Sequence, residues 1–301
     1  MVSPSSKRRA LGWIEEAGLG GKARACRVLG MARSGAYRLP RTSERSRRLR
    51  EQIVELSRKH PRYGYRRVTA MMERAGEVVN NKRTQRVRRQ EGLKVSKRQR
   101  KMKRLGASTA LRQQAQRPHQ VWSWDFVYDQ TESGSSLRLL TLIDEHTRQC
   151  LGIHIAWSIR AVDVITVVEA AMERYGVPEH IRSDNGPEFI AYAIQDWMKA
   201  HEIGSLYIKP GAPWENGHIE SFHDKLRDEC LNREIFGSIL EAKVVVETWR
   251  IEYNQQRPHS SLGYQTPEEF AARALTTLRP TAYAPSERPV NNINPRTELY
   301  F

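Results

Sequence analysis

The chain changes character near Pro118, and this change limits what it can fold into more than any other feature. Residues 1–118 carry 33 lysines and arginines against 8 acidic residues, a net charge of +25. Residues 119–301 carry 17 basic and 26 acidic residues, a net charge of −9. Apolar positions recur at helical spacing in short runs before Pro118, whereas strand-like and helical runs alternate after it. The sequence therefore predicts a basic, all-helical region joined to an acidic α/β domain.

The excess of basic residues favours a polyanionic partner, because affinity for phosphates grows with the number of charges that are neutralised. Double-stranded DNA is the expected partner. Apolar runs such as 165–168 are far shorter than the ~20 residues of a membrane span, so we expect no membrane contact and a cytoplasmic location. Cys26, Cys150 and Cys230 form no CxxC pair, which favours reduced packing residues over a disulfide or a zinc site.

The helical region divides into two candidate helix-turn-helix units and a linker. Residues 1–40 contain three short helical runs, the last at 32–38, and any small helical bundle is the alternative interpretation. In the second unit, residues 41–93, a polar lead at 41–48 precedes the first helix. A later helix over 81–90 is capped by Asn80. Residues 94–118 predict a basic linker.

Basic side chains cover most of the predicted helix over 81–90. Thr84 and Val87 can face a small core, which leaves the basic side chains, Arg88 among them, on a surface suited to a DNA groove. The stretch 94–104 contains seven basic residues in eleven and predicts an extended arm; a solvated charged face is the alternative. The residues expected to contact DNA in these two segments are Lys82, Arg83, Arg86, Arg89, Lys97, Arg98, Arg100 and Lys101.

Residues 119–274 predict a mixed sheet covered by helices. Three strand-like runs come first, at 121–128, 137–143 and 150–156. A helix over 161–175, a short strand at 180–182, a helix over about 188–201, a strand at 206–208 and a helix over about 214–231 follow. Such an order is typical of an α/β layer fold. Residues 275–301 are rich in Pro and Asn and predict a loose tail.

Three acidic residues stand where a carboxylate needs a partner. Asp125 interrupts a strand of large apolar residues, Asp184 directly follows a short strand, and Glu220 borders a helical apolar stripe. Burying a carboxylate without a partner costs several kcal/mol. If the three side chains converge, they could hold two divalent cations ~3.5–4 Å apart, an arrangement that suits phosphodiester chemistry.

The same residues resemble a known family. Asp125, Asp184 and Glu220, with 35 residues between the last two, match the DD(35)E pattern of retroviral-integrase-like transposases. The chain is similar to the second-frame transposase of the large two-frame bacterial insertion-sequence family over about residues 15–272. The segments that carry the resemblance are 60–67, 91–93, 122–126, 184–189, 210–222, 253–262 and 266–267.

The resemblance implies an RNase H-like integrase core and a DNA transposase that binds insertion-sequence ends, cuts the donor strand and transfers its freed 3′-hydroxyl. It makes Asp125, Asp184 and Glu220 catalytic residues and ligands of two Mg²⁺ or Mn²⁺ ions, and Arg227 a DNA contact near them. The implied partners are element terminal repeats, target DNA, further copies of the chain in a homo-multimer, and a first-frame product of the same element. The implied location is the bacterial cytoplasm, at the nucleoid.

Other interpretations stay open. A non-catalytic helix-turn-helix regulator would act without a divalent metal, and a structure-specific nuclease of the same fold would cut DNA without joining it. His218 and His223 flank Glu220 and are interpreted as packing or substrate-side residues. Arg257 and His259 are expected to organise a C-terminal turn against the core.

Overall fold

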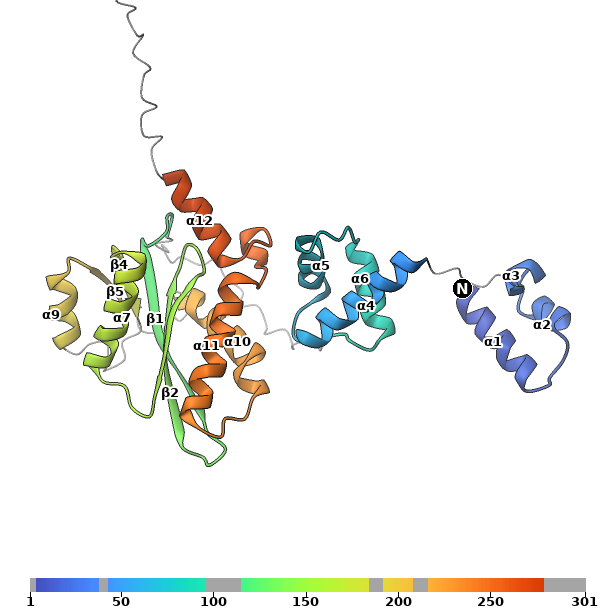
Figure 1. Cartoon of the computed structure of the whole chain (residues 1–301), viewed down its shortest axis with the longest axis horizontal. Coiled ribbons are helices and arrows are strands. Elements are labelled where there is room, and N and C mark those ends of the chain that lie inside the picture. Colours follow the sequence, from blue (N-terminus) through green and yellow to red (C-terminus); the bar gives the residue numbers. More distant parts are fainter. Residues whose placement is uncertain (1–3, 38–42, 96–114, 184–191, 208–215, 279–301) are drawn as a thin grey trace, which may run out of the picture. The chain divides into compact units, whose positions relative to one another are not determined.

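The structure is a computed structural model that describes residues 4–37, 43–95, 115–183, 192–207 and 216–278 (Figure 1). The chain divides into two compact units, Met1–Glu55 and Leu56–Phe301. The first unit contains α1 (Pro4–Glu16), α2 (Lys22–Val28), α3 (Arg33–Tyr37) and most of α4 (Glu44–Lys59). Leu11, Ala25 and Cys26 form its small apolar core.

Helix α4 begins earlier than the sequence suggests. Residues 41–48 were expected to form a polar linker, but part of this segment belongs to the helix, which starts at Glu44. The Ser43 hydroxyl accepts the Ser46 backbone N–H at 3.2 Å, and Glu44 places a negative charge in the first turn, so that both features stabilise a helix start. Leu49 and Ile53 are buried on one face of the helix, as predicted.

The second compact unit, Leu56–Phe301, begins with the end of α4, and its helices α5 (Tyr65–Arg74) and α6 (Asn81–Gln90) pack against each other. Gly76, at φ +81°, follows α5 and allows the chain to leave the helix in a left-handed conformation. The Asn80 side chain accepts the Lys82 backbone N–H at 2.8 Å, which confirms the predicted cap.

The rest of the second unit is built on a mixed five-stranded sheet. Its strands are β1 (Val121–Gln130), β2 (Ser136–Asp144), β3 (Cys150–Ala156), β4 (His180–Ser183) and β5 (Gly204–Tyr207), in the order β3-β2-β1-β4-β5. β1 pairs antiparallel with β2 and parallel with β4. The strand patterns predicted a mixed sheet, and its arrangement is the RNase H-like one that the family resemblance implies.

Helices cover both faces of the sheet (Figure 1). α7 (Ala161–Tyr175) and α9 (Tyr192–Ala200) pack on one face, and α10 (Gly217–Glu229) and α11 (Ile239–Gln255) pack on the other. Short 3₁₀ turns at Leu231–Arg233 and Ser260–Leu262 precede α11 and α12 (Pro267–Leu278) respectively. α12 continues past residue 274, so the start of the expected loose tail at 275 is wrong; residues 279–301 lie outside the described part.

β1 is the central strand and its side chains alternate between the two helical layers. Trp122 and Trp124 are buried in the cluster that contains α7 and α9, whereas Val127 is buried against α10 and α11. Asp125, two residues before Val127, therefore faces α10. All three cysteines are buried and unpaired, as expected. No helix in the described part of the chain is both long and apolar enough to cross a membrane.

Candidate active site

Asp125 lies on β1 with its side chain 23% exposed, between the sheet and α10. Its Oδ1 accepts the backbone N–H of Phe126 at 2.7 Å. Its Oδ2 lies 3.6 Å from Nδ1 of His223 on α10. The carboxylate is therefore held from one side by the strand and faces a helix from the other.

Helix α10 presents Glu220, His223 and Arg227 on one face. Its apolar side chains Ile219, Phe222 and Leu226 are buried in the core, as predicted from their spacing. Glu220 is exposed, and Arg227 donates from Nη2 to the Tyr128 carbonyl at 3.3 Å. Since His223 meets Asp125 and Arg227 meets Tyr128, this face of α10 runs alongside β1.

His223 is the residue of the site that the sequence interpretation undervalued. Its Nε2 lies 2.8 Å from the Thr141 hydroxyl, which also donates to the Asp125 carbonyl at 2.9 Å. Burial, and then the nearby Arg227 cation, lower the pKa of His223 to about 4, so the ring is neutral at neutral pH. The signal available in the sequence was the three-residue spacing from Glu220, but the partner Thr141 on β2 could not be identified without the strand register.

The third predicted acid, Asp184, lies outside the described residues. β4 ends at Ser183, directly before it, and Ser123 of β1 pairs with Arg182 of β4 in parallel register. Within the described ranges no three His, Cys, Asp or Glu side chains form a metal-binding group. The expected ligand set therefore stays a prediction.

Two other acids near the site have structural partners. Asp144 is buried, and its carboxylate accepts the backbone N–H groups of His119 at 3.0 Å and His146 at 2.8 Å. Asp129 accepts the N–H of Gln130 at 2.8 Å. These contacts fit the roles of strand-end and turn residues.

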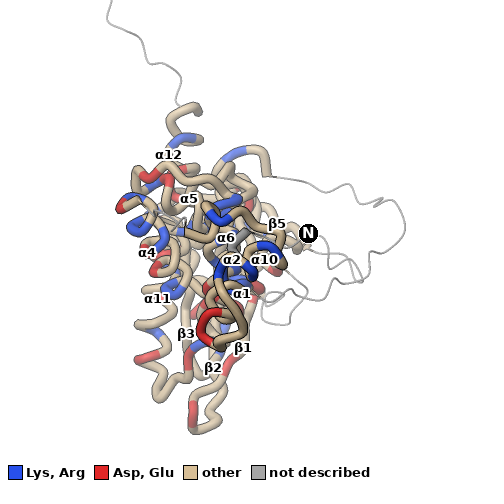
Figure 2. Tube along the Cα trace, turned by 90° about the vertical axis from the view of Figure 1, so that its right-hand side faces the viewer, with Lys and Arg blue, Asp and Glu red and all other residues tan. Residues whose placement is uncertain are grey.

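The basic side chains of the helical region that are expected to contact DNA divide into exposed residues of α6, one half-buried residue of α6 and residues outside the described part. On α6, Lys82, Arg86 and Arg89 are exposed and Arg83 is half-buried, while Thr84 and Val87 face the core as predicted. Figure 2 marks the lysines and arginines of the described residues in blue. The third group, Lys97, Arg98, Arg100 and Lys101, lies outside the described residues.

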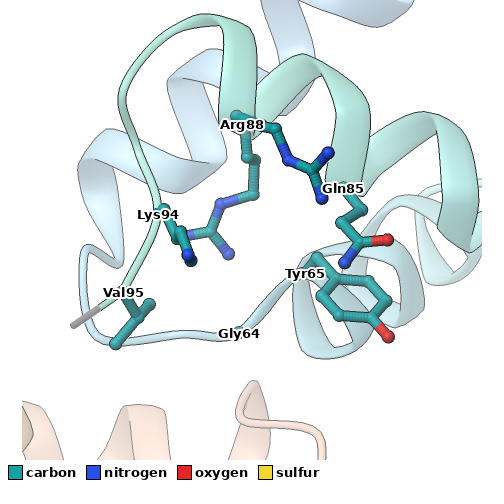
Figure 3. A pocket seen from close by; sticks show the side chains of 7 residues that line it. Gly64, Tyr65, Gln85, Arg88, Lys94 and Val95 are labelled. Atoms are coloured by element: carbon teal, nitrogen blue, oxygen red, sulfur yellow. The ribbon is translucent and has the colours of Figure 1, made fainter. Parts of the chain in front are cut away.

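Arg88 does not belong to this surface, and its assignment to the cationic face of the helix is wrong. The side chain is buried, and its guanidinium donates to the Tyr63 carbonyl and, at 2.8 Å, to the Leu93 carbonyl. It thereby ties the two chain segments that flank α5 and α6. Arg88 also lines a pocket of about 260 Å³ together with Tyr65, Gln85 and Lys94 (Figure 3).

The segment 60–74, assigned from the sequence to the second helix-turn-helix, also contacts the helices α10, α11 and α12 of the same compact unit. Arg74 donates two hydrogen bonds of 2.6 Å to the Glu269 carboxylate, and these lower the pKa of Glu269 to about 2. Arg67 donates from Nε to the Pro258 carbonyl at 3.0 Å. The ion pairs of this 60–74 contact are Arg62–Asp228, Arg67–Glu229 and Arg74–Glu269, and Nδ1 of His60 lies 3.1 Å from Oε1 of Glu252.

Glu229, one of the acids of the 60–74 contact, also forms a buried ion pair with Arg257. Arg257 donates to both oxygens of Glu229 at 2.6 and 2.5 Å, and both side chains are almost fully buried. The Arg257 guanidinium also meets Nε2 of His259 at 3.3 Å. Burial, and then the Arg257 cation, lower the pKa of His259 to about 2. These contacts agree with the turn-organising role expected for Arg257 and His259.

Comparison with known proteins also divides the chain into a helix-turn-helix part and an α/β part. Residues 44–101 match the HTH-like domain family, and residues 115–213 and 201–267 match two families described as integrase core domain. The "Insertion element IS407 uncharacterized 31.7 kDa protein" of Burkholderia multivorans is 38% identical, over 87% of this chain and 93% of that protein. The "Insertion element IS476 uncharacterized 39.2 kDa protein" of Xanthomonas euvesicatoria is 36% identical, over 91% and 79%. Transposase InsF for insertion sequence IS3A of Escherichia coli is 29% identical, over 83% and 93%.

An HTH-like domain followed by an integrase core defines a DNA recombinase of the polynucleotidyl transferase class. The chain belongs to the bacterial insertion-sequence transposases, in which it corresponds to the second-frame protein.

Proposed function

We propose that this transposase binds two divalent cations, Mg²⁺ or Mn²⁺, with Asp125, Asp184 and Glu220. At this site it cuts the donor strand at the element ends and joins the freed 3′-hydroxyl to target DNA. One observation carries the proposal: α10 runs alongside β1 so that the helical face bearing Glu220 meets Asp125, with His223 and Asp125 3.6 Å apart. The parallel pairing of β4 with β1 supports a place for Asp184 at the same end of the sheet.

The donor chemistry of the described residues fits such ions. Asp125 and Glu220 offer carboxylate oxygens, which hard divalent cations prefer, and both side chains are at least partly exposed. When bound, the ions would polarise the scissile phosphate and stabilise the attacking and leaving oxygens. They would also offset the repulsion between the carboxylates and the DNA phosphates.

The chain itself would orient the site and hold the DNA. The Phe126 N–H fixes the rotation of the Asp125 carboxylate, and β1 and α10 fix the distance between the acids. Arg227, exposed beside Tyr128, would bind a phosphate near the reacting bond. Lys82, Arg86 and Arg89 of α6 would bind the backbone of the element end, together with Arg83 and the basic residues 97–101.

The test is cleavage and joining of an oligonucleotide duplex that carries the ends of its own element, with Mg²⁺ or Mn²⁺. We expect Asp184→Asn and Glu220→Gln to lose both cleavage and joining by about 100-fold or more. Glu173→Gln is the matched control, because Glu173 is an exposed glutamate within α7. The triad is wrong if either active-site variant retains the parent's rate.

The same assay separates the alternatives. Strand joining after cleavage supports a transposase and excludes a plain nuclease. A non-catalytic regulator would bind the ends equally well without a divalent metal and would leave them uncut.

We also propose that the chain acts as a homo-multimer, since two element ends must be brought together and one triad per chain cannot easily serve both. Mass measurement with and without end DNA tests this. A single chain bound to each end at saturation would contradict it. We propose a first-frame product of the same element as a further partner.

A further inference from the structure

The contacts of His223 determine which ring nitrogen carries the proton. The Thr141 hydroxyl lies 2.9 Å from the Asp125 carbonyl and 2.8 Å from His223 Nε2. A carbonyl can only accept, so the single hydroxyl proton of Thr141 points to Asp125. Nε2 must then be the donor to the Thr141 oxygen, and in a neutral ring Nδ1 carries a lone pair.

This lone pair faces a negatively charged group. Nδ1 lies 3.6 Å from Asp125 Oδ2, which exceeds a hydrogen-bond distance. Within the described residues Nδ1 makes no hydrogen bond to another group. Two electron-pair donors that face each other at this separation repel, unless a cation lies between them.

We propose that His223 Nδ1 is a nitrogen ligand of a divalent cation held by Asp125. This inference rests on the proposed function, because the ion is the one assigned above to the triad. A histidine ligand commonly has its other ring nitrogen fixed by a hydrogen bond, and the Thr141 hydroxyl supplies that bond here. The three-residue spacing puts His223 and Glu220 on the same face of α10, so one helical turn would supply an oxygen and a nitrogen ligand.

The nitrogen ligand has a consequence for the choice of metal. Imidazole suits transition metals, whereas Mg²⁺ prefers oxygen ligands and near-octahedral geometry. The site should therefore bind Mn²⁺ more tightly than a site of three carboxylates would, and His223 should contribute to Mn²⁺ affinity more than to Mg²⁺ affinity.

Pulsed EPR of Mn²⁺ bound to the full chain is the test, because it detects nitrogen in direct contact with the ion without any DNA or turnover. We expect a ¹⁴N coupling in the parent, replaced by a ¹⁵N coupling when the histidines alone are labelled. His223→Gln, whose amide can reach Thr141 but offers no atom in place of Nδ1, should lose the coupling and about 10-fold or more in Mn²⁺ affinity.

Two further variants distinguish a ligand from a positioning residue. His223→Asn places an amide oxygen near the position of Nδ1, so it should keep more Mn²⁺ affinity than His223→Gln although it loses the Thr141 contact. His218→Gln alters another histidine of α10 and should keep the nitrogen coupling. If the Gln variant binds Mn²⁺ like the parent, His223 is not a ligand.

The outcomes also separate this inference from the proposed function. If Asp125→Asn weakens Mn²⁺ binding but the parent shows no histidine nitrogen coupling, the ligand role of His223 is wrong and the proposed carboxylate site is retained. If the parent does not bind Mn²⁺, or if Asp125→Asn does not change its Mn²⁺ affinity, both the ligand role of His223 and the proposed carboxylate metal site are wrong.

Discussion

At the scale of single residues, Asp125 and Asp129 offer a comparison within one strand. Both carboxylates accept the N–H of the following residue, at 2.7 and 2.8 Å, and both side chains are half-buried. Only Asp125 meets His223 of α10. We therefore expect Asp125→Asn to abolish metal-dependent cleavage while Asp129→Asn keeps it within a few-fold of the parent. Cleavage rates of the two variants at equal protein stability check this, and equal losses would contradict it.

Arg88 and Arg89 are neighbours in sequence with opposite environments. Arg88→Ala leaves two carbonyls without their donor, so the free energy of unfolding should fall by about 1–3 kcal/mol. Arg89→Ala removes an exposed charge and should leave stability within about 0.5 kcal/mol. If Arg89 contacts a phosphate, the same variant lowers the salt dependence of DNA binding by about 0.9 in slope. Denaturant melts and binding titrations over a salt series measure both, and a stability loss for Arg89→Ala would contradict the assignment.

His259 makes stability depend on pH. Its pKa is lowered from its usual value near 6.5 to about 2, by burial and then by the Arg257 cation, so the unfolded chain binds more protons between these values. Stability from this group is complete above about pH 6.5 and falls as the pH drops below it, with a slope of at most about 1.4 kcal/mol per pH unit. Urea melts from pH 7.5 to 5.5 test this against His259→Asn, which should make the decline smaller and leave the part due to His223, whose pKa is also lowered. An unchanged decline would exclude His259 as a cause.

At the scale of elements, the exposed ion pairs of the 60–74 contact and the buried Glu229–Arg257 pair should contribute differently to the free energy of unfolding. Glu229 and Arg257 are almost fully buried, so Arg257→Ala leaves the buried Glu229 carboxylate with the longer 3.7 Å contact to Arg67 and should cost about 3–5 kcal/mol. Arg74 and Glu269 are about a third and nearly half exposed, so Arg74→Ala should cost less than about 1 kcal/mol despite its two short hydrogen bonds. Chemical unfolding of the two variants measures the difference, and similar costs would contradict this ranking.

Local patterns predicted most elements because apolar spacing reports which face of a helix or strand is buried. The predicted bounds of α6, α7 and β3 agree with the structure, as does the apolar stripe of α10. Three features that the sequence did not reveal share a cause, because each depends on a contact with another segment of the chain. The inward turn of Arg88 depends on the Tyr63 carbonyl, and the 60–74 contact depends on acids about 160–195 residues away. The contacts of His223 with Asp125 and Thr141 depend on the register of β1 and β2.

At the scale of the whole molecule, the opposite charges of the two parts of the sequence acquire a physical meaning. The basic excess before Pro118 is suited to the DNA backbone, and the acidic residues after it include both the proposed metal ligands and the partners of the 60–74 contact. High salt should therefore weaken DNA binding far more than it weakens the fold, since the Glu229–Arg257 pair is shielded from solvent. DNA affinity and the free energy of unfolding can be measured in parallel between about 50 and about 500 mM salt. Equal sensitivity of the two quantities to salt would contradict this prediction.

The most direct test of the central claim is a crystal structure of the transposase with an element-end duplex and Mn²⁺, in which anomalous scattering locates the metal. We predict Mn²⁺ within about 2.0–2.6 Å of carboxylate oxygens from Asp125, Asp184 and Glu220. Manganese bound elsewhere, or any of these carboxylates too far from the other two to share an ion with them, would contradict the account.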